Sequence, residues 1–328
     1  MRSVLYLSHA KPDVYDIIRE AMPAGYELLT LEQDSDDERR SKIRDVEVAI
    51  VAAYPLRKAV IDAARALRLV HHQGVGYQDT VDYAVLAERG IGLALTPAGT
   101  TEVVAEHTIL LLLAILKRLP FADRELRQGR WHINTLRPVS RELRGMTIGY
   151  IGMGRIGQAV ASRLAAFGTS GLYFDPKVRL GADRETSLNL RAASLDDLLA
   201  QSDAVTLHLP ASAETKHLIG PVALARMKRG AYLVNTSRGS LVDETALLAA
   251  LKEGRLAGAG LDVFETEPPG ANPLFALDNV VVTPHISAGT RDALAEKMRS
   301  VFSNIERFYR GQPLENQVLP PKLGVAAE

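Results

Sequence analysis

An apolar segment that runs directly into a glycine-rich turn constrains the fold more than any other part of this 328-residue chain. Thr147–Ile151 is followed by the pattern Gly-x-Gly-x-x-Gly and then by the helical segment 158–167. In such a unit the first glycine makes a tight turn, the second lets the backbone approach a pyrophosphate, and the third lets the helix pack closely on the sheet. The pattern therefore predicts a dinucleotide site, with these cofactor contacts: Gly152, Gly154, Arg155, Ile156 and Gly157.

A second expected strand, 171–174, ends at Asp175, eighteen residues past Gly157. An acid near this position accepts hydrogen bonds from the ribose hydroxyls of an adenosine. A carboxylate there repels a 2′-phosphate, so NAD(H) is favoured over NADP(H), although Lys177 and Arg179 keep NADP(H) open. The alternative is that Asp175 only ends the strand in a turn.

Short apolar runs alternate with helical segments, which predicts two βα domains with parallel sheets, an α/β fold. The first hundred residues hold four expected strands: 4–7, 48–51, 69–71 and 92–94. A second series has six, as a doubly wound nucleotide-binding sheet requires: 147–151, 171–174, 204–207, 231–235, 258–261 and 280–283. Between the two series lies segment 101–119, a helix apolar on every side. Such a helix must be buried by more than one neighbour.

Composition argues against several classes of partner and site. Lys plus Arg and Asp plus Glu both total 39, and a formal net charge of zero argues against nucleic acid. The chain has no cysteine, and adjacent His71 and His72 would point to opposite faces of a strand, so we expect no metal site. The longest apolar run, 109–116, is far shorter than the ~20 residues that cross a bilayer. We expect a cytoplasmic protein without membrane contact.

Three reactive side chains, Arg238, Glu267 and His285, follow the last three expected strands, at the sheet edge where open α/β folds bind ligands. A histidine can give or take a proton near neutral pH, and Glu267 beside it would raise its pKa. The planar guanidinium of Arg238 can hold a carboxylate. This set predicts hydride transfer between a nicotinamide and a small 2-keto or 2-hydroxy acid.

Taken in order, the motifs resemble those of the D-isomer-specific 2-hydroxyacid dehydrogenases, which include glyoxylate and hydroxypyruvate reductases, D-lactate dehydrogenases and phosphoglycerate dehydrogenase. The resemblance covers nearly the whole chain and rests on segments 102–107, 152–157, 208–210, 235–239, 262–268 and 284–285. It implies that Arg238 is the substrate arginine, Glu267 its paired acid and His285 the acid/base histidine. It also implies further cofactor contacts: His208, Pro210, Thr236 and, at the nicotinamide carboxamide, Asp262.

The same resemblance implies that a Rossmann-type NAD-binding domain, residues 101–288, is inserted into a smaller flavodoxin-like substrate-binding domain, residues 1–100 and 289–328. Val75 and Gly76 would belong to a backbone nest that clamps the substrate carboxylate. Tyr54, Val75 and Tyr77 are candidates for contacting the rest of the substrate, although Tyr54 could equally serve packing alone. The loop 76–82 is one residue longer than the family's common form.

Glyoxylate or hydroxypyruvate is the leading expectation for the substrate, with a larger 2-keto acid left open. We expect a homodimer because helix 101–119 needs extra cover, with Trp131 packed on that helix or on the partner subunit. His107 is expected to be a packed or interface histidine. One alternative is a non-enzymatic NAD(H)-binding regulator of the corepressor type, and another is a relative of adenosylhomocysteine hydrolase. The regulator would not need Arg238, Glu267 and His285. The adenosylhomocysteine hydrolase relative would need further segments for its substrate.

Overall fold

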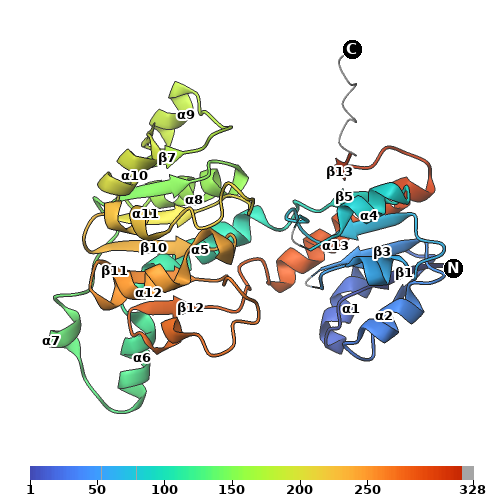
Figure 1. Ribbon diagram of the computed structural model, residues 1–328, viewed down its shortest axis with the longest axis horizontal. Helices are drawn as coiled ribbons and strands as arrows, with labels where there is room; N and C mark the ends of the chain where they lie inside the picture. Colours follow the sequence, from blue (N-terminus) through green and yellow to red (C-terminus); the bar gives the residue numbers. More distant parts are fainter. Residues whose placement is uncertain (53, 79, 320–328) are drawn as a thin grey trace. The chain divides into compact units, whose positions relative to one another are not determined.

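The computed structural model describes residues 1–319 with the exception of 53 and 79. The chain forms two compact units, one from Met1–Thr100 together with the segment that begins at Thr290, and one from Thr101–Gly289 (Figure 1). Each unit has its own sheet with helices around it, which confirms the predicted α/β fold class.

The first unit contains a sheet in the order β13-β5-β4-β3-β1-β2. Strands β1 to β5 run parallel, and β13 pairs antiparallel with β5. The order 2-1-3-4-5 of the parallel strands is that of flavodoxin-like folds. Two of these strands were not among those expected, the edge strands β2 and β13. The strands are β1 (Arg2–Tyr6), β2 (Tyr26–Leu29), β3 (Val48–Val51), β4 (Leu69–His72), β5 (Gly92–Leu95) and β13 (Gln317–Val318).

The described residues of this unit form five helices: α1 (Pro12–Glu20), α2 (Asp36–Lys42), α3 (Lys58–Ile61), α4 (Tyr83–Glu88) and α13 (Arg291–Tyr309). The acidic residues before and within α2 mark a helix start, because the Ser35 hydroxyl accepts a hydrogen bond from the Glu38 N–H. The last helix returns to the sheet, where Phe302 and Ile305 share a buried cluster with Val4 and Ile50. The first strand and helix α13 therefore share one core.

The second unit contains a fully parallel sheet in the order β12-β11-β10-β9-β6-β7-β8. Counted from β6, this is the doubly wound order 3-2-1-4-5-6 with one strand added. The chain reverses direction across the sheet between β6 and β9, which is where such folds bind ligands. The strands are β6 (Thr147–Ile151), β7 (Ser170–Phe174), β8 (Leu190–Ala192), β9 (Ala204–Leu207), β10 (Ala231–Asn235), β11 (Leu256–Leu261) and β12 (Val280–Val282).

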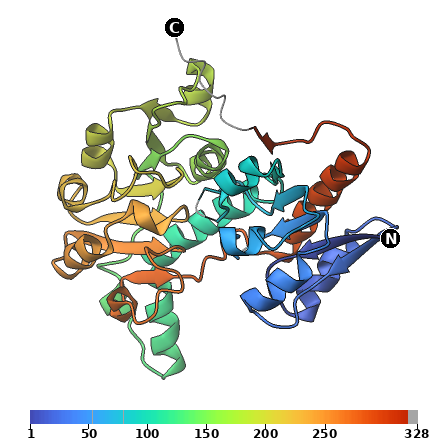
Figure 2. The same ribbon diagram turned by 45° about the vertical axis from the view of Figure 1, so that its right-hand side comes forward.

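The helices of the second unit are α5 (Thr101–Leu116), α6 (Leu119–Arg127), α7 (Ile133–Leu136), α8 (Arg155–Ala165), α9 (Ala182–Ser187), α10 (Leu195–Gln201), α11 (Pro221–Arg226) and α12 (Glu244–Lys252), with 3-10 turns η1 (Gly239–Leu241) and η2 (Pro273–Ala276). Figures 1 and 2 both show the segment that contains α6 and α7 projecting from the sheet. No helix in the described part of the chain is both long and apolar enough to span a bilayer.

Helix α5 is buried mainly by its own unit. Leu112 and Ile115 lie in one cluster with Tyr150 of β6 and Leu164 of α8. Helix α5 therefore needs less cover from a second subunit than the sequence indicated. Trp131 does not pack on α5, because its side chain is 75% exposed. The expectation that Trp131 packs on this helix is therefore wrong, and its contact with a partner subunit stays a prediction.

Candidate active site

The glycine turn lies at the carboxyl end of β6, beside the loop that follows β9. Gly152 has a φ of +97°, which favours glycine, and a Cβ atom there would lie 2.5 Å from the His208 carbonyl oxygen. A Cβ on Gly157 would overlap the Gly152 carbonyl. These two glycines are thus required by the turn itself and bring α8 close to the sheet.

Gly154 differs from its neighbours because a Cβ atom there would meet no protein atom within 4 Å, and its φ of −72° suits any residue. The fold alone gives no reason for glycine at this position. The first N–H to bond back along α8 is that of Gln158, which donates to the Gly154 carbonyl. The N–H groups of Arg155, Ile156 and Gly157 therefore start a helix and lie where a pyrophosphate would be held.

Asp175 ties the end of β7 to the glycine turn. One carboxylate oxygen accepts from the Met153 N–H at 2.8 Å, and the other accepts from the N–H groups of Lys177 and Val178 at 2.8 and 2.9 Å. These contacts support the alternative in which Asp175 ends the strand in a turn. They do not exclude ribose binding, because each carboxylate oxygen has more than one lone pair.

The loop after β9 supplies His208 and Pro210. Burial lowers the pKa of His208 to about 3, so its ring is neutral, and Nε2 lies 2.9 Å from the Thr206 hydroxyl. The exposed Pro210 accepts a hydrogen bond at its carbonyl from the Thr215 hydroxyl at 3.0 Å. His208 borders the glycine turn through the close approach of Gly152 to its carbonyl, and Pro210 follows two positions later in the same loop.

The loop that carries Arg238 is fixed from two directions. Asn235 at the end of β10 accepts from the Ser237 N–H at 3.0 Å and donates to the Arg238 carbonyl at 2.8 Å. A Cβ atom on Gly239 would overlap the Phe264 carbonyl, so this glycine lets the Arg238 loop lie directly against the loop of Glu267. These roles of Asn235 and Gly239 were not predicted from the sequence. An asparagine at a strand end, which favours a side-chain turn, was the available signal.

His285 and Glu267 form a hydrogen-bonded pair, with His285 Nδ1 2.7 Å from Glu267 Oε2. The other carboxylate oxygen, Glu267 Oε1, accepts from the Phe264 N–H at 3.0 Å. The hydrogen bond to Glu267 raises the pKa of His285 against the effects of burial and of the Arg238 charge. Burial alone would raise the pKa of Glu267, but the bonds from His285 and Phe264 and the charges of His285 and Arg238 lower it. The three predicted residues thus act on one another within a single site.

Asp262 holds the turn that presents His285. Its carboxylate is fully buried and accepts from the Thr283 hydroxyl at 2.6 Å and from the N–H groups of Ile286 and Ser287 at 2.9 Å each. The Asp262 carbonyl accepts from the His285 N–H at 2.8 Å. These bonds maintain a φ of +52° at His285, a left-handed conformation that is unfavourable for a residue with a side chain. A contact of Asp262 with a carboxamide stays a prediction.

The first unit carries the residues predicted to contact the substrate. Val75 lies in the loop after β4 with its side chain 45% exposed, and the Gly76 carbonyl accepts from the Thr80 hydroxyl at 3.2 Å. The Tyr54 hydroxyl donates to Asp36 at 2.9 Å, and the buried Arg39 guanidinium lies 3.6 Å from its ring centre. This geometry accounts for the packing alternative at Tyr54. The loop 76–82, which was predicted to be one residue longer than the family's common form, contains Asp79. This residue lies outside the described residues.

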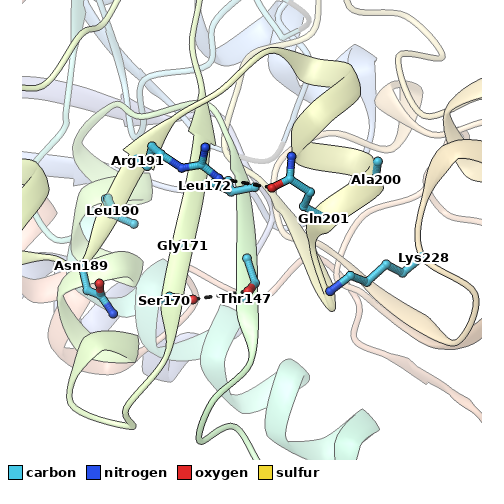
Figure 3. A pocket seen from close by; sticks show the side chains of 10 residues that line it. All are labelled: Thr147, Ser170, Gly171, Leu172, Asn189, Leu190, Arg191, Ala200, Gln201 and Lys228. Atoms are coloured by element: carbon cyan, nitrogen blue, oxygen red, sulfur yellow. Dashed lines mark hydrogen bonds between the residues drawn. The ribbon is translucent and has the colours of Figure 1, made fainter.

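A hollow of about 470 Å³ lies at the opposite edge of the second sheet, at the amino ends of β6, β7 and β8 (Figure 3). Arg191 in this hollow donates to Gln201 at 3.2 Å, and Lys228 pairs with Asp203 at 3.0 Å. The charge of Lys228 is therefore neutralised within the chain, whereas Arg191 is bonded to a neutral amide. The hollow is separate from the glycine turn and from the reactive trio, which follow the carboxyl ends of their strands.

Comparison with known proteins agrees with this geometry. The family model described as D-isomer specific 2-hydroxyacid dehydrogenase, NAD binding domain, matches residues 109–287. A glyoxylate reductase from Korarchaeum cryptofilum is 41% identical over 86% of this chain and 83% of its own length. A D-3-phosphoglycerate dehydrogenase from Archaeoglobus fulgidus is also 41% identical, over 80% of this chain, but the match spans only 49% of that relative.

Among solved structures, a D-lactate dehydrogenase from Aquifex aeolicus in complex with NAD and lactic acid has a TM-score of 0.82 and 30% identity. The match covers 94% of this chain and 96% of that one. Together with the NAD-binding family model, it identifies NAD(H) as the cofactor, as the glycine turn and Asp175 predict.

Proposed function

Because the chain belongs to the D-isomer specific 2-hydroxyacid dehydrogenase family, an NAD-dependent family of oxidoreductases that act on CH–OH groups, we propose that it interconverts a small 2-keto acid and the corresponding D-2-hydroxy acid. Glyoxylate or hydroxypyruvate is the leading substrate. The observation that carries the proposal is the 2.7 Å contact of His285 with Glu267 beside the charge of Arg238.

The chemistry divides among the three residues by charge. NADH, when bound, supplies the hydride for the keto carbon. The imidazolium of His285, with Nδ1 held by Glu267, gives its Nε2 proton to the carbonyl oxygen, so the C=O bond becomes CH–OH. In the reverse direction neutral His285 removes the hydroxyl proton. Arg238 binds the carboxylate and orients the keto group. Glu267 keeps His285 charged for reduction, which agrees with the raised pKa of that histidine.

A small substrate without a phosphate fits the first unit better than a phosphorylated one. No cluster of Arg or Lys adjoins Gly74 in the sequence, whereas a phosphate needs cationic partners. We assign carboxylate binding in this unit to the loop of Val75 and Gly76, and the whole unit to substrate binding. The 41% identical glyoxylate reductase supports the size of the substrate.

We further propose that the protein is a homodimer that uses the segment of α6 and α7. Large apolar side chains gather on this segment with substantial exposure: Leu119, Leu126, Trp131, Ile133 and Val139. Monomeric proteins rarely display so many apolar groups in one place. Most of α5 is already buried, so the expected contact lies on the projecting segment.

The test of the proposed function is a steady-state screen of NADH and NADPH oxidation by the purified protein. Glyoxylate, hydroxypyruvate, pyruvate and bulkier 2-keto acids are compared, and the chirality of the product is determined wherever the reaction creates a stereocentre. We expect turnover with NADH, highest for the small keto acids, and a D product. Tight binding of NADH without turnover of any keto acid would favour the regulator alternative.

A further inference from the structure

Helix α5 lies unusually close to the sheet of the second unit, over the strands that lead to the reactive trio. A Cβ atom on Gly260 of β11 would lie 2.9 Å from the Cβ of Leu111. The glycine thus lets the helix backbone approach the middle strand of β10, β11 and β12. Since β10 leads to Arg238 and β12 to His285, a rigid helix above both strands can set the distance between their loops.

His107 on α5 reaches the turn of His285 through a short chain of hydrogen bonds. The Thr283 hydroxyl uses its single hydrogen on Asp262 Oδ1, at 2.6 Å. His107 Nε2, 3.0 Å from the same hydroxyl, must therefore be the donor to it, and it lies 3.5 Å from Asp262 Oδ1. The His107 side chain is mostly buried. The helix is thus linked, through the Thr283 hydroxyl, to Asp262, which holds the left-handed turn of His285.

The next residue, Thr108, reaches the other loop. Its hydroxyl lies 2.9 Å from the Thr236 hydroxyl, and both side chains are buried. Thr236 directly follows β10 and stands two positions before Arg238. Two adjacent side chains of one helix therefore bond to the two loops on which the trio depends, and neither bond is needed to form the helix itself.

We propose that His107 and Thr108 are positioning residues that set the geometry of the active site from α5, His107 through Thr283 and Asp262 to His285, and Thr108 through Thr236 to Arg238. The proposal rests on the proposed function, because it assigns His285 to proton transfer and Arg238 to the substrate carboxylate. It replaces the expectation that His107 is only a packed or interface residue.

The first test uses His107→Leu and His107→Gln. Leucine removes the donor, whereas the glutamine side chain can place an N–H where His107 Nε2 lies. We expect His107→Leu to lower kcat by up to about a hundredfold, because displacement of a reacting group by ~1 Å has such an effect. The KM for the keto acid and the affinity for NADH should change little. His107→Gln should restore most of the activity, and Glu106→Gln, an exposed neighbour on α5, is the matched control.

A readout independent of activity is the NMR titration of the His285 imidazole, assigned with His285→Gln. Glu267, Arg238 and Asp262 act on this ring. If the turn shifts in His107→Leu, the bond to Glu267 weakens and the pKa of His285 moves down toward the ordinary value, while Glu106→Gln leaves it in place. Thr283→Val should reproduce the result, and the double variant should add little because both changes break one chain of bonds.

The second test uses Thr108→Val, which keeps the shape of the side chain, and Thr108→Ser, which keeps the hydroxyl. Because Arg238 binds substrate, Thr108→Val should raise the KM for the keto acid about tenfold, the effect of losing one hydrogen bond, with a smaller change in kcat. Thr108→Ser should stay near the parent protein.

Two results would overturn the proposal. One is a His107→Leu protein whose kcat and His285 titration match those of the parent, and the other is a His107→Gln protein as impaired as His107→Leu. Failure of the proposed function is a different result, in which the parent protein itself turns over no keto acid. The titration of His285 still tests the bond network in that case.

Discussion

In the proposed mechanism, the hydrogen bond between His285 and Glu267 sets the pH range over which the protein reduces a keto acid. Because the pKa of His285 is raised, the imidazolium persists above the ordinary histidine value of 6.5, and reduction should slow only as pH rises through the raised pKa. In Glu267→Gln the hydrogen-bond partner loses its charge. The descending limb of kcat/KM should then move to lower pH, with a loss of about ten- to hundredfold at pH 8. A pH–rate profile with an unmoved limb would contradict this role of Glu267.

The same pair couples stability to pH in both directions. The contribution of His285 is complete below its ordinary pKa and is lost as pH rises through the raised value. The contribution of Glu267 is complete above its ordinary pKa and is lost as pH falls through the lowered value. Between the lowered pKa of Glu267 and the raised pKa of His285, both groups are charged and favour the folded state.

Asp175 should control the choice between NAD and NADP. Asp175→Asn keeps the size of the side chain but removes the charge that repels a 2′-phosphate. We expect the ratio of kcat/KM for NADH over NADPH to fall by about tenfold, the equivalent of one interaction of ~1.4 kcal/mol. Asp175→Ala should narrow the ratio as well but also lower the melting temperature, because the carboxylate holds three backbone N–H groups. An unchanged ratio in Asp175→Asn would remove the ribose assignment.

Among single residues, the members of the trio could be predicted from the sequence, but the residues that hold them in place could not. Arg238, Glu267 and His285 could be predicted because each follows an expected strand at the sheet edge where open α/β folds bind ligands. The roles of Thr283 and Gly239 could not, since each depends on contact between segments far apart in the chain. From the sequence, Tyr54 could have contacted the substrate or served packing alone. Its contacts with Asp36 and Arg39, which the sequence could not show, account for a packing role.

At the scale of elements, the glycine turn offers a direct comparison of ligand binding with folding. In Gly154→Ala the new Cβ meets no protein atom, so the melting temperature should change by less than about 2 °C, while NADH binding should weaken at least about tenfold. Gly181→Ala is the matched control, because Gly181 also begins a helix of this unit with φ of −72° and open space around a Cβ. It should leave both quantities unchanged. Equal NADH affinity in all three proteins would place the pyrophosphate elsewhere.

Strands and helices with strong periodicity were predicted within a few residues, and the short edge strands were not. β3, β6, β9 and β10 have the bounds that the sequence indicated. β2 and β13 were missed because each is only a few residues long and is defined by pairing with a distant strand. Helix α5 was correctly expected to be buried, but the sequence could not show that its own unit supplies most of the cover.

At the scale of the whole molecule, the projecting segment of α6 and α7 should decide the oligomeric state. Trp131→Asp places a charge on the most exposed of its large apolar side chains. We expect sedimentation velocity to report a dimer for the parent protein and a shift toward monomer for Trp131→Asp. Val222→Asp, an equally drastic change at an exposed position on α11, should leave the dimer intact. A parent protein that sediments as a monomer would exclude the proposed dimer.

The division into two units has a consequence for the chemistry. The trio and the glycine turn all belong to the second unit, which the NAD-binding family model covers almost completely. The residues proposed to carry out the reaction therefore lie in one unit, whereas the proposed substrate contacts of Val75 and Gly76 belong to the other. This separation explains why the sequence predicted the reaction class and the cofactor, while the individual substrate stays a prediction.

Single-turnover oxidation of bound NADH by the best keto acid shows whether His285 moves the proton that accompanies hydride transfer. Fluorescence measures NADH affinity and stopped-flow absorbance measures hydride transfer, for the parent protein and for His285→Gln. We predict NADH affinities within about twofold of each other and a transfer rate that falls by about 10²- to 10⁴-fold in the variant, the usual contribution of a general acid. Equal transfer rates in the two proteins would contradict the assignment.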